Sequence, residues 1–193
     1  MRWEQLFADL DSRFDELADA EMMAELPDRQ RSAAGSLTVV QRCIGAIGAD
    51  VRVRVRSGAL HSGELRGVGP DWILLGMTSP GEVLLSMVAV VTIDGLTATT
   101  GAPLSVVGSR IDLRLAMRGI ARDRSPVVIG VMGAPDGMAG AGTELSGTID
   151  RVGADFIEMA QHATWEPRRA SSVRSMLLVP IGAVDSVRAM PRV

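Results

Sequence analysis

The sequence predicts a mainly β protein with helices at its N-terminus, built from two copies of a small β-barrel. Three observations predict this class. Segment 63–73 recurs at 147–157 with two glycines and an aspartate in common, short segments alternate apolar and polar residues, and Gly- or Pro-containing turns follow one another closely after residue 50. Because duplication fixes architecture and leaves chemistry open, the repeat predicts a scaffold and not an activity.

An amphipathic helix is expected near the N-terminus. Apolar residues recur there at three- and four-residue spacing with acidic residues between them, and Pro27 is expected to end or kink the helix near Leu26. Such a stripe must be buried, either against a barrel of its own chain or against another subunit or a partner. The candidate partner-docking residues are Trp3, Leu6, Phe7, Leu10 and Phe14.

The pattern then changes from helical to strand periodicity. Apolar residues at helical spacing between Leu37 and Ile47 predict a second helix. Segment 51–56 alternates Val and Arg strictly, so the valines are expected to face a core and the arginines to face outward. Turn signals at 57–58, 69–70 and 80–81 divide residues 50–95 into short strands.

A second copy is expected from residue 108. Ile111–Leu115 alternates as Val51–Val55 does, at an offset of 60, and is interpreted as its first strand. The offset grows to 84 at the repeated segment, which implies an insertion containing segment 127–132 and a glycine-rich hairpin tip at 133–142. Segment 84–93 matches 178–187 at an offset of 94, which implies another insertion near 164–175.

The first copy resembles Sm-like proteins in the run Val53-x-Val55-x-x-Gly58-x-x-x-x-Gly63-x-Leu65-x-x-Val68, which is similar to their first motif. The resemblance covers residues 36–95, and more loosely 108–190. It implies a short helix followed by five strongly bent strands. The expected elements are a helix at about 36–47, strands near 50–56, 60–69, 71–78, 82–86 and 90–94, and a turn at Met87 to Ala89.

The expected fold class is therefore tandem SH3/Sm-like five-stranded β-barrels preceded by amphipathic helices. Four parts are expected along the chain. They are an N-terminal amphipathic helical arm at 1–35, a first barrel with its leading helix at 36–96, an uncharged linker at 97–107, and a second barrel with long insertions at 108–190.

The family's RNA-binding residues are not kept at the matching positions. Sm-like proteins that bind uridine-rich RNA place an Asp and an Asn after the first motif and an Arg-Gly or similar pair in the second. These places are taken here by Gly69, Ile73 and Ser86-Met87, and in the second copy by Gly153, Ile157 and Pro180-Ile181. Because an isoleucine cannot hydrogen-bond a base edge, the resemblance implies the fold without the RNA site.

The motifs point away from catalysis. His61 and His162 lack neighbours at metal-ligand spacing and are expected on the surface or in loops. The glycine-rich segment 137–143 lacks the Gly-Lys-Ser/Thr ending of a phosphate loop. Asp71 and Asp155 recur in a turn, each followed by an aromatic residue expected in a core. We expect no catalytic residue, no cofactor and no bound metal, and therefore no enzyme.

Charge is distributed unevenly along the chain. The net charge is −3, but residues 1–28 hold nine of the 23 acidic residues against only Arg2 and Arg13, so the remainder is mildly basic. This balance permits nucleic-acid binding without favouring it, because such proteins usually carry clustered basic residues. The best candidate patch consists of Arg52, Arg54, Arg56 and Arg66.

Composition also bears on location and redox chemistry. No apolar run reaches the roughly 18 residues of a membrane-spanning helix, and the N-terminus is acidic where a signal peptide is basic. A cytoplasmic protein with no membrane partner is therefore expected. The single cysteine, Cys43, allows no internal disulfide and is expected to be a buried thiol.

Together these observations predict a non-enzymatic binding or scaffold protein that acts through contacts with a protein partner or with further copies of itself. The alternative is a regulator that binds RNA or DNA through the arginine-lined face of a barrel. The two hypotheses differ in salt dependence, because phosphate contacts weaken steeply as salt rises.

Overall fold

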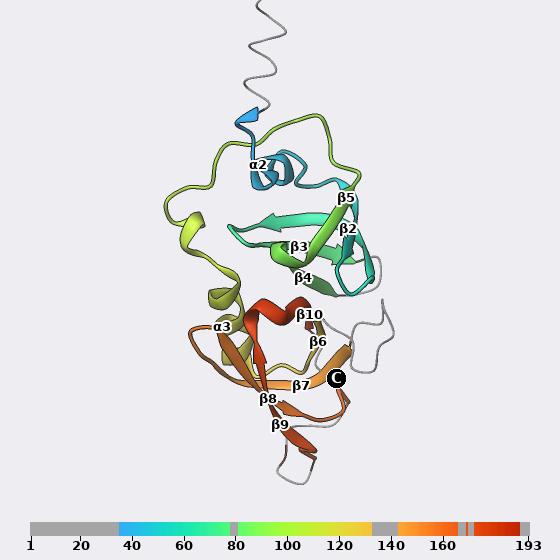
Figure 1. Cartoon of the computed structure of the whole chain (residues 1–193), viewed down its shortest axis with the longest axis vertical. Helices are drawn as coiled ribbons and strands as arrows, with labels where there is room; N and C mark the ends of the chain where they lie inside the picture. The colour runs from blue at the N-terminus through green and yellow to red at the C-terminus, as the bar shows by residue number, and fades with distance from the viewer. Residues whose placement is uncertain (1–34, 78–80, 133–142, 166–168, 170–171, 190–193) are drawn as a thin grey trace, which may run out of the picture. The chain divides into compact units, whose positions relative to one another are not determined.

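The computed structural model describes residues 35–77, 81–132, 143–165, 169 and 172–189 (Figure 1). The chain divides into two compact parts, Met1–Thr38 and Val39–Val193, and the second part holds all of the described strands. The candidate docking residues Trp3, Leu6, Phe7, Leu10 and Phe14 lie outside the described residues, as does the expected hairpin tip at 133–142.

The prediction of a mainly β protein is confirmed, since the described strands form one antiparallel ten-stranded sheet that is not closed. Its order is β5-β1-β2-β3-β4-β10-β6-β7-β8-β9. The strands of the first repeat are β1 (Asp50–Val55), β2 (Leu60–Val68), β3 (Trp72–Met77), β4 (Glu82–Ser86) and β5 (Val90–Asp94). Those of the second repeat are β6 (Val127–Val131), β7 (Thr143–Val152), β8 (Phe156–Gln161), β9 (Ser175–Pro180) and β10 (Val184–Ala189).

The two repeats have the same internal strand order, and they meet at a junction where β4 pairs with β10. The strands expected between residues 50 and 94 agree with β1 to β5. A short 3-10 helix precedes the last strand of each repeat, η1 (Met87–Ala89) before β5 and η3 (Ile181–Ala183) before β10. The boundaries 1–35, 36–96, 97–107 and 108–190 stay a prediction.

The offset of 84 holds residue by residue in the central hairpins. Gly63 lies opposite Met77, and Gly147 lies opposite Gln161. The register of β2 with β3 shifts after Leu65, and that of β7 with β8 shifts at the matching place. A bulge bends a strand and increases its twist, so both hairpins curve at the same point.

The strand expected at Ile111–Leu115 is wrong. This segment leads into a helix, α3 (Leu113–Asp123), whose N-cap Asp112 accepts a hydrogen bond from the backbone nitrogen of Leu115 at 2.7 Å. Leu113 and Met117 are buried one turn apart, while Leu115 is exposed. Apolar residues at three alternate positions fit one turn of a helix as well as a strand, so five residues were too few to separate the two periods.

The strand that corresponds to β1 is β6, which makes segment 127–131 part of the repeated fold and not part of an insertion. Val51 lies opposite Gly63, just as Val127 lies opposite Gly147. The helix α3 then corresponds to α2 (Val39–Ile44), because α2 contacts β2 while α3 contacts β7 (Figure 1).

Each repeat has its own hydrophobic core. The alternation predicted for β1 is confirmed, since Val51, Val53 and Val55 are buried and the intervening arginines are exposed. The expectation of a buried thiol is also confirmed: Cys43 of α2 belongs to the first core, where burial raises the pKa of its thiol although Arg42 acts in the opposite direction.

The segment after β5 is fastened to α2. The Arg42 guanidinium donates hydrogen bonds to the carbonyl oxygens of Thr97 and Ala98, both at 2.8 Å. A Cβ added to Gly45 would lie 2.4 Å from the carbonyl oxygen of Thr99, so only glycine permits this close backbone approach. The chain thus crosses the helix of the first repeat before it reaches the second.

Candidate protein-docking site

At the junction, a side chain of the first repeat completes the core of the second. Leu84 of β4 lies opposite Val187 of β10 in the antiparallel ladder. Leu84 is 7% exposed and belongs to the same buried cluster as Val184 and Val187. Leu84 therefore points away from the core of the first repeat and into the core of the second.

The turn before β3 also reaches across the junction. The Trp72 indole Nε1 donates a hydrogen bond to the carbonyl oxygen of Ile111 at 2.7 Å, and the Asp71 carboxylate accepts one from the backbone nitrogen of Leu113 at 2.8 Å. Burial raises the pKa of Asp71, while the hydrogen bond from Leu113 acts to lower it. Asp71 thus binds the N-terminal turn of α3, and Trp72 packs on the core of the other repeat.

The repeat-equivalent residues are placed differently. Asp155 is exposed, and within the described part of the chain it makes no contact like that of Asp71. From the repeat, both aspartates are expected to have the same role in a turn. The backbone part of that role is shared, since Met87 donates to the carbonyl oxygen of Asp71 and Ile181 donates to that of Asp155. The carboxylates differ because only one faces the other repeat.

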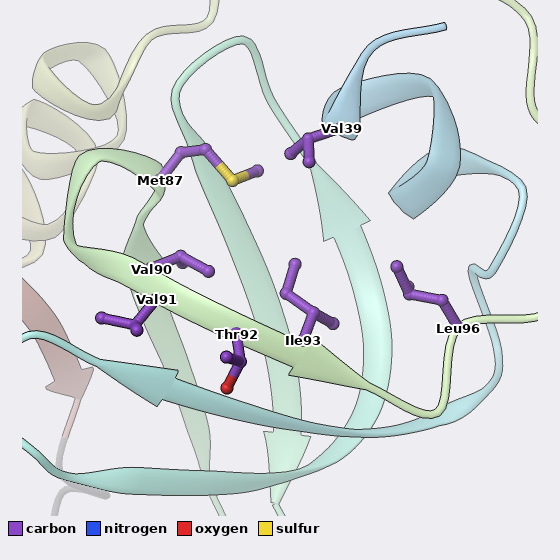
Figure 2. Close-up of a pocket in the computed structure, with 7 residues that line it drawn as sticks. All are labelled: Val39, Met87, Val90, Val91, Thr92, Ile93 and Leu96. Atoms are coloured by element: carbon purple, nitrogen blue, oxygen red, sulfur yellow. The ribbon is translucent and has the colours of Figure 1, made fainter. Parts of the chain in front are cut away.

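An apolar groove of about 300 Å³ runs along β5, at one open end of the sheet (Figure 2). Figure 2 shows Val39 of α2 and Met87 of η1 pointing toward the same space over β5 as Ile93. Thr92 is the one lining residue with a polar side chain. The lining residues are Val39, Met87, Val90, Val91, Thr92, Ile93 and Leu96.

This groove occupies the place in the first repeat that Leu84 fills in the second. The second residue of β5, Val91, has no partner on β1, and the second residue of β10, Asp185, has no partner on β6. The two strands therefore match residue by residue, so that Val90 corresponds to Val184 and Ile93 to Val187. Val184 and Val187 are buried beside Leu84, whereas Val90 and Ile93 line the groove.

The helices show the same difference. Cys43 and Met117 are each buried four residues after the first residue of their helix, so Val39 corresponds to Leu113. Leu113 is 3% exposed in the second repeat, while Val39 is 53% exposed at the rim of the groove. Side chains of the first repeat, Leu84 with Trp72 and Leu74, thus cover this site in the second repeat, whereas the corresponding site of the first repeat is open.

The other open end of the sheet carries the matching leucine. Leu84 lies opposite Leu74, and Leu178 of β9 lies opposite Glu158, which is the residue 84 positions after Leu74. Leu178 is 62% exposed and Met176 on the same strand is 56% exposed. The edge of β9 therefore presents to solvent the side chain that β4 buries at the junction.

The predicted arginine patch has a mixed charge. Arg52 pairs with Asp94 of β5, and Arg66 pairs with Glu64 at 3.3 Å and with Glu82 at 3.0 Å. Arg54 donates to the carbonyl oxygen of Gly58 at 3.5 Å. The acids that pair with Arg52 and Arg66 come from β2, β4 and β5. All four arginines of the patch are exposed on or next to β1 and β2: Arg52, Arg54, Arg56 and Arg66.

Both histidines are buried, so the expected surface placement is wrong: His61 lies within β2, while His162 lies in a loop but is buried there. His162 follows β8 directly. Its Nδ1 donates to the carbonyl oxygen of Ala163, and its Nε2 shares a hydrogen bond with the hydroxyl of Thr148, both at 2.8 Å. A carbonyl oxygen can only accept, so Nδ1 is the donor of its hydrogen bond.

His61 and Asp185 form a buried polar pair at the junction. His61 is 9% and Asp185 1% exposed, and His61 Nε2 and one oxygen of Asp185 lack a hydrogen-bond partner among the described residues. Burial lowers the pKa of His61, and the charge of Asp185 acts to raise it. The counterparts of these two residues are Leu145 and Val91, so the pair belongs to the junction alone.

Within the described part of the chain, no three His, Cys, Asp or Glu side chains gather in a way that could hold a metal ion. None of the helices described has the length and apolar character needed to cross a bilayer.

Comparison with known proteins gave no relative: no family model, curated protein or solved structure matches the chain.

Proposed function

We propose that this chain is a non-enzymatic binding protein built from two SH3/Sm-like five-stranded barrels, and that it binds a protein partner along the open edge of β5. The barrel assignment is supported by the identical strand order of the repeats, their separate cores and their bulges at matching positions. A bent five-stranded sheet around its own core is how such small barrels are built.

The groove beside β5 is the observation on which the binding function rests. It combines an apolar lining with the free edge that β5 has among the described strands. An added strand uses both, because its backbone completes the ladder and its side chains enter the pocket. The partner expected is an extended segment with a leucine-sized side chain, because Leu84 on such a segment fills the corresponding site of the second repeat.

Peptide binding to the full chain tests this function. The probe is a fluorescent peptide of residues 173–182, with the peptide carrying Leu178→Asp as its control. We expect saturable binding of the first peptide, little binding of the second, and at least a tenfold loss with the protein variant Val39→Asp. Val106→Asp, at a 73% exposed residue outside the groove, should bind as the original protein does.

Equal binding of both peptides, or unchanged peptide binding by the Val39→Asp protein, would refute the proposed groove.

Binding to nucleic acid is measured with a mixed pool of RNA and DNA at low salt. Since Arg52 and Arg66 are already paired with acids, we expect no salt-sensitive binding. Binding that weakens steeply with salt and is lost in an Arg54→Ala, Arg56→Ala variant would favour the regulator instead.

A further inference from the structure

We infer that α3 and the turn before it form a surface that attaches this chain to an anionic lipid bilayer. The turn spans residues 105–112, includes η2 (Gly108–Arg110) and leads directly into α3 (Figure 1). None of the residues that line the β5 groove belongs to this surface, so the inference goes beyond the proposed function and does not depend on it. The α3 surface consists of Val106, Val107, Arg110, Leu115, Arg118 and Arg122.

The turn holds two valines out in solvent. Its own hydrogen bonds fix its shape: the Ser105 hydroxyl accepts one from the backbone nitrogen of Gly108 at 3.0 Å, and the Ser109 hydroxyl donates one to the carbonyl oxygen of Val106 at 2.9 Å. Val106 is 73% and Val107 is 71% exposed. A single exposed apolar residue is ordinary, but here a hydrogen-bonded turn presents two of them side by side.

The end of the turn and the start of α3 are fastened to the first repeat. The Trp72 indole donates a hydrogen bond to the carbonyl oxygen of Ile111, and the Asp71 carboxylate accepts one from the backbone nitrogen of Leu113. On the inner face of α3, Leu113 and Met117 are buried in the second core. The outer face of the helix is therefore held in a fixed position next to the turn.

The outer face of α3 is basic. Leu115, Arg118 and Arg122 are exposed and follow one another at spacings of three and four residues, which places them on one side of the helix. Arg110 precedes the helix and is also exposed. Within the described part of the chain, no acidic side chain forms an ion pair with Arg110, Arg118 or Arg122. This distinguishes α3 from the predicted patch on β1 and β2, where acids pair with two of the four arginines.

An anionic bilayer uses both properties of this surface. Its phosphate groups accept paired hydrogen bonds from guanidinium groups, and the acyl region beneath them takes up aliphatic side chains. A nucleic acid or an acidic peptide would bind the arginines and leave Val106 and Val107 in water. The exposed valines therefore favour a bilayer over other polyanions.

The net charge of −3 does not oppose this attachment. At physiological salt, charges are screened beyond about 8 Å, so the charge close to the lipid decides the interaction. Segment 105–124 holds five arginines against two aspartates. The expectation of no membrane partner came from the lack of a spanning segment and from the acidic N-terminus, and attachment to a bilayer surface needs neither a span nor a signal peptide.

Co-sedimentation of the full chain with lipid vesicles tests the inference. Vesicles of equal parts phosphatidylcholine and phosphatidylglycerol are compared with vesicles of phosphatidylcholine alone, and we expect binding to the mixed vesicles and little binding to the neutral ones. Arg118→Gln with Arg122→Gln should weaken binding at least tenfold, because each arginine near an anionic surface contributes about fivefold. Arg54→Gln with Arg56→Gln removes the same charge from β1 and the turn after it, and should bind as the original chain does.

The valine pair supplies a second test, which electrostatic attraction alone would not pass. Val106→Ser with Val107→Ser should weaken binding to the mixed vesicles about tenfold or more, because it removes the side chains that enter the acyl region. Val88→Ser, at a 58% exposed residue of η1, is the matched control and should change nothing. All of these side chains are exposed, so folding should be retained, and circular dichroism checks it.

Several outcomes would overturn the inference. They are no binding to the mixed vesicles, equal binding to both kinds of vesicle, full binding by the valine variant, and an equal loss in the variant of Arg54 and Arg56. Salt-sensitive binding to the pool of RNA and DNA that is lost in the α3 arginine variant, without vesicle binding, would assign the surface to nucleic acid instead. The groove variant Val39→Asp should bind vesicles as the original chain does, so that failure of the vesicle test and failure of the peptide test are distinguishable.

Discussion

The two repeats agree in register and differ in what covers their last strand. In the second repeat, β10 is covered by β4, so Val187 and Leu113 are buried. In the first repeat, β5 has no such neighbour among the described strands, and Ile93 and Val39 line a groove. Duplication thus produced two similar cores and one internal junction, and left one copy of each joining surface free. The repeats therefore differ at their edges and not in their interiors.

Removing the leucine at each edge gives the largest expected difference. Leu84→Ala should lower the free energy of unfolding by about 2–4 kcal/mol, because it leaves a cavity in the second core. Leu178→Ala should change it by less than about 0.5 kcal/mol, since that side chain is exposed. Chemical denaturation measures both, at a protein concentration where the chain is monomeric. An equal loss of unfolding free energy in the two variants would mean that Leu84 at the junction stabilises the fold no more than Leu178 at the open edge.

The aspartates before β3 and β8 give the next largest difference. Asp71→Ala should cost about 1–2 kcal/mol, because the backbone nitrogen of Leu113 loses its acceptor at the start of α3. Asp155→Ala should cost less than about 0.5 kcal/mol, as is usual for an exposed residue. The same denaturation series checks both. A loss of similar size at Asp155 would show that the turn, and not the junction, accounts for the effect.

The sequence predicted what is encoded locally. The Val and Arg alternation identified β1, and the glycine and aspartate pairs at an offset of 84 identified the central hairpins. Segment 111–115 failed because five residues fit both a strand and the first turn of a helix. The N-cap Asp112, three residues before the nitrogen it binds, was the available signal for the helix.

The candidate docking site could not be predicted in this way. Leu84 and Leu178 occupy equivalent strands in equivalent patterns, and only tertiary pairing buries one and exposes the other. The buried His61 was missed for the same reason, since its counterpart is a leucine and a single histidine carries no signal of burial. The acids that neutralise Arg52 and Arg66 come mostly from other strands, so a basic run overstated the charge of the face.

The polar pair at the junction predicts a specific pH dependence. Burial holds the pKa of His61 below its usual 6.5. At a pH between the lowered pKa of the folded chain and 6.5, the unfolded chain binds a proton that the folded chain does not. The free energy of unfolding should therefore fall as pH decreases through about 6.5. His61→Leu, which copies Leu145, should remove this part of the slope. Denaturation at several pH values checks it, and an unchanged slope in the variant would place the titration elsewhere.

The smallest expected effect concerns the ion pairs at corresponding places on β5 and β10. Asp94 pairs with Arg52 with both side chains 65% exposed, whereas Arg188, the counterpart of Asp94, pairs with Glu144 and is 34% exposed beside β4. Solvent screens the first pair more fully, so Asp94→Asn should cost less than about 0.5 kcal/mol and lose even that at high salt. Glu144→Gln should cost about 0.5–1 kcal/mol and depend less on salt, because β4 shields Arg188. Denaturation of both variants at low and high salt separates them. Identical salt dependence of the two variants would show that β4 does not shield Arg188 from solvent. The difference between the repeats would then be confined to the apolar side chains of the groove.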